Sequence, residues 1–476
     1  MSRLADPAKD FPQWYLDVIA QADLSDYSEV KGCIIFKPYG YALWEGIQHD
    51  MDRRIKALGV DNVYFPLLIP ASLLAKEKDH VEGFAPECAV VTEGGGKKLT
   101  EALYIRPTSE TIMYATFAKW IHSHRDLPLK INQWANIVRW EMRTRPFLRT
   151  LEFLWQEGHT AHATMEDADE MANAALKMYE DFDRDFLALP VVTGRKPDHE
   201  KFAGAYYTMT TEALARDGKA IQAGTSHNLG QGFSEAYDVS FLDANGKAQR
   251  PWMTSWGAST RLIGTIIVVH GDAKGLRLPP PLAPIQAVIV PIYKSDEEKA
   301  AVLKAAGTLQ ESLKATIRIR LDDRAEKSPG FKFNEWEVKG VPIRLELGPK
   351  DLEKKQVMVV RRDTGEKTPM PLASCTPEAM TALLADIHKT LYAQAKAFME
   401  EHTSSAETMD EFTKLIEGKG GFVWAAWDGT VESADAIKQQ TKATIRILGE
   451  QKPPKGAKDI QSGKPATMMA LYAKAY

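Results

Sequence analysis

The sequence predicts an α+β protein with three parts: a first domain on one large antiparallel sheet, an α/β domain with a mixed sheet, and a small α+β domain. Long strand-like apolar runs with helices between them fill residues 1–277, an order typical of α+β domains. Shorter strands alternate with helices over residues 285–400, as in compact α/β domains. The run LPPPLAP at residues 278–284 indicates a linker between them. Residues 401–476 remain for the third domain.

Length and charge limit the class of protein. A chain of 476 residues exceeds one ordinary hydrophobic core, so several domains are expected. Sixty basic residues against 64 acidic ones give a net charge of −4. Because non-specific nucleic-acid binders usually carry a basic excess, this balance argues against a coating protein. It still allows local basic patches on a selective RNA-binding protein.

The cysteines and the N-terminal segment predict a cytoplasmic protein with no membrane contact. Cys33, Cys88 and Cys375 form neither a paired framework nor a metal-binding spacing, which fits a reducing compartment. The first residues lack the apolar segment of a secretory signal, and no later run is long enough to span a bilayer.

Strand and helix patterns in the first domain follow from hydrophobic periodicity. Helical spacing of Tyr41, Trp44, Ile47, Met51, Ile55 and Leu58 predicts a helix that stops at Gly59. A second long helix is expected over residues 166–187. The strands are predicted at residues 63–70, 130–140, 151–162 and 252–261. Pro66 marks an edge or a bulge in the first of these, because proline cannot donate to a ladder.

The second and third domains follow from the same patterns. Strands are predicted at residues 286–293, 317–322, 341–348 and 356–363, and helices at residues 296–314, 331–340 and 377–398. Residues 436–476 carry eight Lys or Arg against Glu450 and Asp459, so the end of the chain is locally basic.

Common nucleotide motifs are missing, but an arginine constellation remains. The sequence contains no G-x-x-x-x-G-K-[ST] and no G-x-G-x-x-G. Arg139 and Glu141 alternate with Trp140 at the end of the strand that begins at residue 130, so they are expected on one face, and an arginine-rich loop follows. Arg261 is expected to begin a helix. Each arginine alone is best explained as a surface ion pair, but together they indicate a site for an anionic nucleotide, because guanidinium binds phosphate bidentately.

Several segments resemble the class II aminoacyl-tRNA synthetases. FPLLIP, VRWE with FLRTLEFLWQEGH, and GASTRLIG are similar to motifs 1, 2 and 3 of that class. RPTSE at residues 106–110 and QAGTSHNLGQGF at residues 222–233 resemble the prolyl-tRNA synthetases. The resemblance covers nearly the whole chain and is closest to the short archaeal and eukaryotic-like type, which has no editing insertion between motifs 2 and 3.

The resemblance implies the fold and the reaction. The catalytic domain is expected to have an antiparallel sheet of six or seven strands. The protein is expected to be a homodimer. L-proline and ATP, the latter with Mg²⁺, would give prolyl-adenylate and pyrophosphate, and the prolyl group would then pass to the 3′ end of tRNA(Pro). No protein nucleophile and no histidine base are expected, because aligning and neutralising two anions supplies most of the catalysis.

The resemblance also implies site residues, with Arg139 and Arg261 as the catalytic pair. The residues expected to bind ATP are Arg139, Glu141, Arg149, Thr150, Phe153, Gln222, Thr225, Ser259 and Arg261. The residues expected to bind proline are Thr108, Glu110, Arg139, Trp155, Glu157, Phe202 and His227. Trp155 and Phe202 could each be ordinary core aromatics, but the other expected proline-binding residues favour a place in the proline pocket. Such a pocket separates proline from alanine by about two methylenes, or ~1–3 kcal/mol, so misactivation of alanine is expected.

The second domain resembles the anticodon-binding domain of several class II synthetases. The residues expected to contact the anticodon are Lys332, Phe333, Glu337, Arg344, Glu346 and Lys350. Mixed acidic and basic groups suit the edges of bases in single-stranded loops. For any one of these residues taken alone, a charged surface exposed to solvent is almost as good an explanation as a contact with the anticodon.

The third domain departs from the family pattern. Four cysteines often bind structural zinc there, and the aligned positions here are Val423, Asp428, Ile460 and Ser462. None of these can supply a thiolate, so no zinc is expected. Core packing should hold the domain instead, with Phe422, Trp424 and Trp427 as candidates. The terminal Tyr476 is expected to pack back toward the active site.

Two other classes of function stay open at this point. A non-catalytic nucleic-acid-binding relative could keep the fold without the chemistry, although Arg139, Glu141 and Arg261 together oppose this. An amino-acid-activating paralogue could charge a different carrier, although the anticodon-like domain opposes that.

Overall fold

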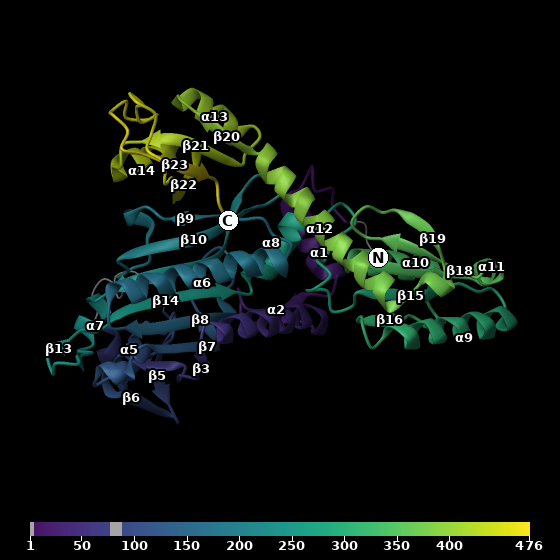
Figure 1. Ribbon diagram of the computed structural model, residues 1–476, viewed down its shortest axis with the longest axis horizontal. Coiled ribbons are helices and arrows are strands. Elements are labelled where there is room, and N and C mark those ends of the chain that lie inside the picture. Colours follow the sequence, from purple (N-terminus) through teal and green to yellow (C-terminus); the bar gives the residue numbers. More distant parts are fainter. Residues whose placement is uncertain (1–3, 77–87) are drawn as a thin grey trace.

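The computed structural model describes residues 4–76 and 88–476 as three sheet-based units. Figure 1 shows the large-sheet unit at the lower left, a five-stranded unit at the right and a four-stranded unit at the top. Helix α12 (Pro377–Glu401) runs diagonally from the five-stranded unit to the four-stranded unit. Within the described residues, the helices include none with the length and apolar character that a membrane crossing requires.

Seven strands form the large sheet in the order β3-β7-β8-β14-β11-β10-β9. All neighbours pair antiparallel except β3 and β7, which are parallel, so the antiparallel sheet predicted from the sequence is confirmed. The strand bounds are Asp61–Asn62 (β3), Leu129–Val138 (β7), Glu152–His162 (β8), Val192–Arg195 (β9), Tyr207–Leu214 (β10), Ala220–Gly230 (β11) and Trp252–Ser259 (β14).

Helix α6 (Met165–Asp185) covers one face of this sheet. Its N-terminus is capped by Thr164, whose hydroxyl accepts a hydrogen bond from the Asp167 amide at 3.1 Å. Its buried stripe includes Met171, Tyr179 and Phe182, at the spacing of an amphipathic helix. The helix therefore leaves only the opposite face of the sheet open to a ligand.

The predicted N-terminal helix is confirmed as α2 (Pro38–Ala57). Gly59 follows with φ +72°, the left-handed conformation that ends many helices. Tyr41 differs from expectation, since it is 42% exposed while the other apolar positions face the core. Helices α1 (Phe11–Gln21) and α8 (Arg261–His270) pack against each other beside it.

Two predicted strands are shorter than expected. Only β4 (Leu68–Pro70) forms in the run at residues 63–70. Ahead of it, Gln133 accepts a hydrogen bond from the Phe65 amide, and Arg106 donates one to the Phe65 carbonyl at 2.7 Å. Beside Pro66, side chains therefore bind the backbone groups that a neighbouring strand would otherwise bind. Strand β7 ends at Val138, which leaves Arg139 and Glu141 in the following loop rather than on one strand face.

Several further elements were not predicted from the sequence, and most of them are only a few residues long. They are α3 (Ala71–Leu74), α5 (Glu110–Trp120), α7 (Gly232–Ala236), β1 (Ser25–Tyr27), β2 (Ile34–Phe36), β5 (Val90–Gly94), β6 (Lys97–Ile105), β12 (Phe241–Leu242), β13 (Ala248–Gln249) and three 3₁₀ turns at His124–Asp126, Asp198–Glu200 and Leu372–Ser374. Strands β4, β6 and β5 form a separate three-stranded sheet.

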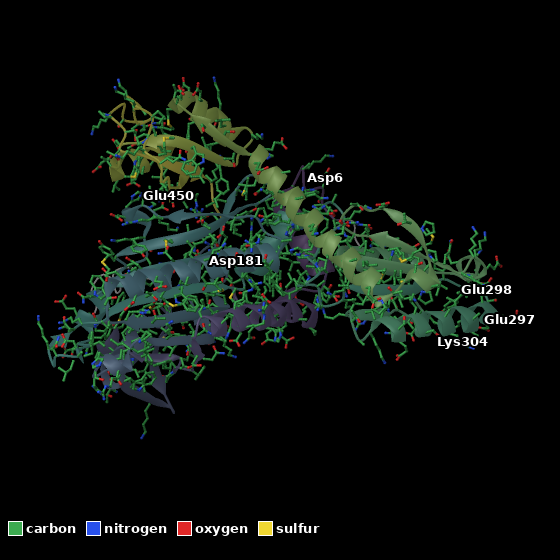
Figure 2. The ribbon with its side chains drawn as sticks, in the orientation of Figure 1. Asp6, Asp181, Glu297, Glu298, Lys304 and Glu450 are labelled. Carbon is green, nitrogen blue, oxygen red and sulfur yellow. The ribbon has the colours of Figure 1, made fainter. Side chains whose placement is uncertain are left out.

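The five-stranded unit has the mixed sheet expected, in the order β16-β15-β17-β18-β19. Strand β15 pairs parallel with β16 and β17, and the remaining pairs are antiparallel. The bounds are Ala287–Pro291 (β15), Ile319–Leu321 (β16), Ile343–Leu347 (β17), Gln356–Arg361 (β18), Lys367–Pro371 (β19), Asp296–Leu313 (α9), Pro329–Val338 (α10) and Pro349–Glu353 (α11). Figure 2 labels Glu297, Glu298 and Lys304, which belong to α9.

The four-stranded unit contains β20 (Thr403–Ala406), β21 (Phe422–Trp427), β23 (Met468–Ala473) and β22 (Thr444–Leu448) in that spatial order, with α13 (Met409–Glu417) and α14 (Val431–Thr441). Phe422 and Trp427 are buried, and Trp424 is half-buried. At the positions aligned with zinc ligands, Val423 is a core residue and the Ser462 hydroxyl donates to Asp428 at 2.8 Å.

The expected linker at residues 278–284 is packed rather than loose. Leu278 and Leu282 are buried in the core of the large-sheet unit. The Arg318 guanidinium donates hydrogen bonds of 2.8–2.9 Å to the carbonyls of Pro280, Pro281 and Ala283. Because three donors on one planar group bind this backbone, the five-stranded unit is held firmly to the large sheet.

A close backbone approach in the centre of the large sheet gives a stability prediction. A Cβ added to Gly158 on β8 would lie 2.2 Å from the ring of Trp256 on β14, which is fully buried. We expect Gly158→Ala to lower the free energy of unfolding by about 1–3 kcal/mol, because the overpacked indole cannot move away. Urea unfolding followed by tryptophan fluorescence measures this loss.

Gly307→Ala is the matched control for that variant. Gly307 lies within α9, where an added Cβ meets nothing within 4 Å. Alanine there should raise stability by roughly 0.5–1 kcal/mol through its helix propensity. Equal stability of the two variants would contradict the packing account.

Candidate active site

A cavity of about 250 Å³ opens on the face of the large sheet opposite α6. Successive side chains of a strand point to opposite faces, and β8 shows this directly. Gln156 accepts a hydrogen bond from Tyr179 of α6 at 2.6 Å, whereas Trp155 and Glu157 line the cavity. Alternate residues of β8 therefore pack against α6 on one face of the sheet and line the cavity on the other.

Most residues proposed from the sequence meet in this cavity. Its lining includes Thr108, Glu110, Arg139, Phe153, Trp155, Glu157, Phe202, Gln222, Thr225, His227, Ser259 and Arg261. Glu141, Arg149 and Thr150 lie outside the lining: Arg149 pairs with Glu141 at 3.3 Å in the loop between β7 and β8, and Thr150 is buried. Sequence reasoning missed Lys196 and Glu200, which also line the cavity, because their charged run carries no motif.

Arg139 lies beside two neighbouring aromatic rings at one side of the cavity. Its guanidinium carbon is 5.6 Å from the ring centroids of both Phe153 and Trp155, a cation–π distance. Its Nε donates to the Pro107 carbonyl at 2.9 Å. These contacts fix the plane of the guanidinium, as bidentate binding of a carboxylate or phosphate requires.

Arg261 is the first residue of α8, so it adds its charge to the positive end of a helix dipole. Its Nε donates to the Leu148 carbonyl at 3.2 Å. Burial, followed by repulsion from Arg139 and Arg149, lowers the pKa of Arg261 to about 10. The side chain remains charged at neutral pH, and the repulsion would be relieved by an anion between these arginines.

Carboxylates dominate another part of the lining. Glu157 accepts hydrogen bonds from Ser109 at 2.5 Å, Gln133 at 2.9 Å and His159 at 3.1 Å. Glu110 accepts one from the Thr108 hydroxyl. These two carboxylates offer acceptors for a cation, while Arg139 and Arg261 offer donors for an anion. The cavity is thus suited to a zwitterion joined to a phosphate.

The charge of His159 follows from this network. Burial lowers the pKa of His159, but its hydrogen bond to Glu157 and the charges of Glu110 and Glu157 outweigh burial, so the pKa is raised above 6.5. The other ring nitrogen lies 3.1 Å from the Tyr114 hydroxyl. His159 therefore orients Glu157 beneath the cavity.

Phe202 and His227 form an apolar wall. Their rings stack at 4.7 Å with an interplanar angle of 28°. The His227 Nδ1 lies 2.9 Å from the Thr208 hydroxyl. Burial is the largest cause that lowers the pKa of His227 to about 3, so the ring is neutral near pH 7. With Trp155, this wall suits a small aliphatic ring.

The C-terminal residue lies near the loop between β7 and β8. The Tyr476 hydroxyl donates to Asp217 at 2.8 Å. Arg145 of that loop lies 5.6 Å from the Tyr476 ring centroid, and Lys219 lies 4.9 Å from it. The chain terminus thus packs beside the arginine-rich loop rather than within the cavity lining.

The six residues proposed for anticodon contact differ in their surroundings. Lys350 is exposed and Phe333 lies 4.6 Å below the Arg344 guanidinium. Lys332 is buried and donates to the Asp322 carbonyl at 2.9 Å, and Glu346 is buried between Arg344 and Lys367. The Glu337 side chain pairs with Lys274 at 3.1 Å. A base contact by Lys332 or Glu346 would have to replace internal bonds.

Comparison with known proteins assigns each unit to a family. The tRNA synthetase class II core domain for G, H, P, S and T matches residues 92–270, and the anticodon binding domain matches residues 286–378. The prolyl-tRNA synthetase C-terminal domain matches residues 409–476. This chain belongs to the prolyl-tRNA synthetase family.

Relatives of this prolyl-tRNA synthetase family match along almost their whole length. The chain is 52% identical to a proline–tRNA ligase of Roseiflexus sp. (strain RS-1), covering 98% of both chains. It is 51% identical to that of Chlorobium luteolum over 98% of both chains. It is 52% identical to that of Rubrobacter xylanophilus, covering all of this chain and 99% of the relative.

The neutral state of His227 gives a prediction on pH. The unfolded state binds a proton on this histidine below about pH 6.5, whereas the folded state binds it only near pH 3. Unfolding free energy should therefore fall as the pH drops below 6.5. We expect His227→Gln to remove about 2 kcal/mol of this dependence between about pH 7 and pH 5, as measured by urea unfolding.

His124→Gln serves as the control because His124 is exposed. A His227→Gln variant with the same slope as that control would show that His227 is not held neutral.

Proposed function

We propose that this chain is a proline–tRNA ligase that activates L-proline with ATP and transfers it to the 3′ end of tRNA(Pro). The observation that carries the proposal is the cavity with two carboxylates, an apolar ring wall and two fixed arginines. Proline is a zwitterion with an apolar ring, and ATP is a polyanion, so the pair matches these three features. Family membership supports the same reaction.

In the first step the proline carboxylate attacks the α-phosphate of ATP, forming a C–O–P linkage and releasing pyrophosphate. Arg139 bridges the carboxylate and the α-phosphate, while Arg261 neutralises charge on the phosphates. Two anions are brought together, so alignment and charge neutralisation supply the rate enhancement. The secondary amine binds near Glu110 and Glu157, and its ring packs against Trp155 and Phe202.

The remaining site residues act around this centre. Phe153 supports the adenine ring, and Gln222, Thr225 and Ser259 contact ATP from β11 and β14. ATP enters with Mg²⁺ as a substrate complex. In the second step the terminal ribose hydroxyl of tRNA(Pro) attacks the activated carbonyl and AMP leaves. We further propose a cytoplasmic homodimer whose five-stranded unit binds the anticodon, supported by its match to the anticodon binding domain.

Loss of Arg139 should stop activation. We expect Arg139→Ala to lower kcat/KM for proline-dependent ATP–pyrophosphate exchange by roughly 100-fold or more, because the bridging charge acts on the transition state. Arg139→Lys should recover little, since an ammonium cannot bind two groups in one plane. Arg143→Ala is the control, because this neighbouring arginine is exposed and outside the cavity lining.

Charging of tRNA separates the alternatives. Exchange without charging of tRNA(Pro) would indicate an enzyme that charges another carrier. Neither activity in the unaltered protein would indicate a nucleic-acid-binding relative and would refute the proposal.

Selectivity against alanine should be limited. An apolar wall distinguishes proline from alanine by about two methylenes, or ~1–3 kcal/mol. We therefore expect alanine-dependent exchange with kcat/KM on the order of 10- to 200-fold below that of proline. Glycine-dependent exchange, measured beside it, should be weaker still. Undetectable exchange at millimolar alanine would show that the wall excludes alanine by another means.

A further inference from the structure

A buried ion pair joins the four-stranded unit to the sheet beside the cavity. Arg446 on β22 donates to both carboxylate oxygens of Glu212 on β10, at 3.0 and 3.1 Å. The Glu212 side chain is 0% exposed and that of Arg446 is 10% exposed. Thr210 also donates to Glu212, at 3.0 Å. The carboxylate therefore has each oxygen occupied by donors fixed in place.

Lys196 lies close to this pair and inside the cavity. It follows directly after β9, the strand that pairs with β10 and packs against β22, and it is 9% exposed. In residues 4–76 and 88–476, no carboxylate lies within ion-pair distance of its amine. A buried ammonium without a counterion is unfavourable, so the position favours an anionic ligand.

Charged groups from several elements act on Lys196, and they include Arg261, which we place on the phosphates. Burial lowers the pKa of Lys196, the charges of Glu212 and Glu200 oppose this effect, and Arg446 and Arg261 add to it. Glu212 likewise acts on Arg261, the arginine that we place on the phosphates. The charge of Glu212 thus acts on both Lys196 and Arg261 without pairing with either, and Arg446 is the residue that binds this carboxylate.

We propose that Lys196 binds a phosphate group of ATP and that Arg446 is a positioning residue that holds Glu212 so that this carboxylate does not neutralise Lys196. The inference rests on the proposed function, since it names a further residue for the same substrate. It assigns a role to the four-stranded unit, because that unit supplies the guanidinium of Arg446 that holds Glu212. Proline binds by its carboxylate to Arg139, so Lys196 should affect ATP and not proline.

Lys196→Met tests the binding role in the full-length chain. We expect the KM for ATP in ATP–pyrophosphate exchange to rise on the order of tenfold, as for loss of one charged hydrogen bond. The KM for proline should change by less than about twofold, and Lys196→Arg should restore much of the ATP binding. Arg195→Met is the matched control: Arg195 is the preceding residue, pairs with Asp198 at 3.3 Å and does not line the cavity.

Arg446→Met tests the positioning role. Releasing Glu212 toward Lys196 should raise the KM for ATP several-fold, and the effect should be small in a Lys196→Met background. Glu212→Gln added to Arg446→Met should bring the KM for ATP back toward that of the unaltered enzyme, because the released negative charge is gone. A merely structural role for the ion pair would give no such rescue. If Arg446→Met does not fold, the double variant and Lys196→Met still decide the question.

Each outcome has a defined meaning. An unaltered KM for ATP in Lys196→Met, or an equal rise in the KM for proline, overturns the binding role. Failure of Glu212→Gln to rescue Arg446→Met overturns the positioning role. In both cases exchange by the unaltered enzyme still supports the proposed function, whereas its absence would refute that function instead.

Discussion

The structure depends on the separation of the two faces of the large sheet. Helix α6 covers one face with Met171, Tyr179 and Phe182, and the absence of a side chain at Gly158 lets the Trp256 ring of β14 pack against β8. Because side chains alternate along a strand, fixing one face fixes the other. A shift of β8 by one residue would move Trp155 and Glu157 under α6 and remove the cavity.

On the open face, the charged groups are held on strands and helices or directly beside them. Glu157 projects from a strand, and Arg261 stands at the start of a helix whose dipole adds to its charge. Arg139 lies just after β7, and its amide still donates to the Leu151 carbonyl at 2.8 Å. Preorganised groups of this kind need little rearrangement when charge moves in the reaction.

The three units are joined by charged and polar contacts that are themselves partly buried. Arg362 binds Asp272 with two hydrogen bonds of 2.6 and 2.8 Å between the five-stranded unit and the large-sheet unit. Arg446 binds Glu212 in the same bidentate way from the four-stranded unit. Removing one partner of such a pair leaves a buried charge uncompensated, so these joints also fix the relative positions of the units.

The sequence by itself determined the fold class, several of the helices and strands, and most of the cavity residues, but it did not predict strands β9, β10 and β11 of the large sheet. Periodicity of two placed Trp155 and Glu157 on one face of β8, and motif resemblance brought Thr108, His227 and Arg261 together, because both signals depend on local order along the chain. Only the tertiary structure could show that β7 ends before Arg139, where the chain turns into a loop.

Only the tertiary structure decided which charged residues are available to a ligand. Lys332 and Glu346 resemble surface recognition residues in the sequence, but both are buried and internally bonded. Lys196 and Glu212 carry no motif, and Arg446, which pairs with Glu212, lies 234 residues farther along the chain. Burial and long-range pairing depend on how distant segments pack, and no local pattern encodes them.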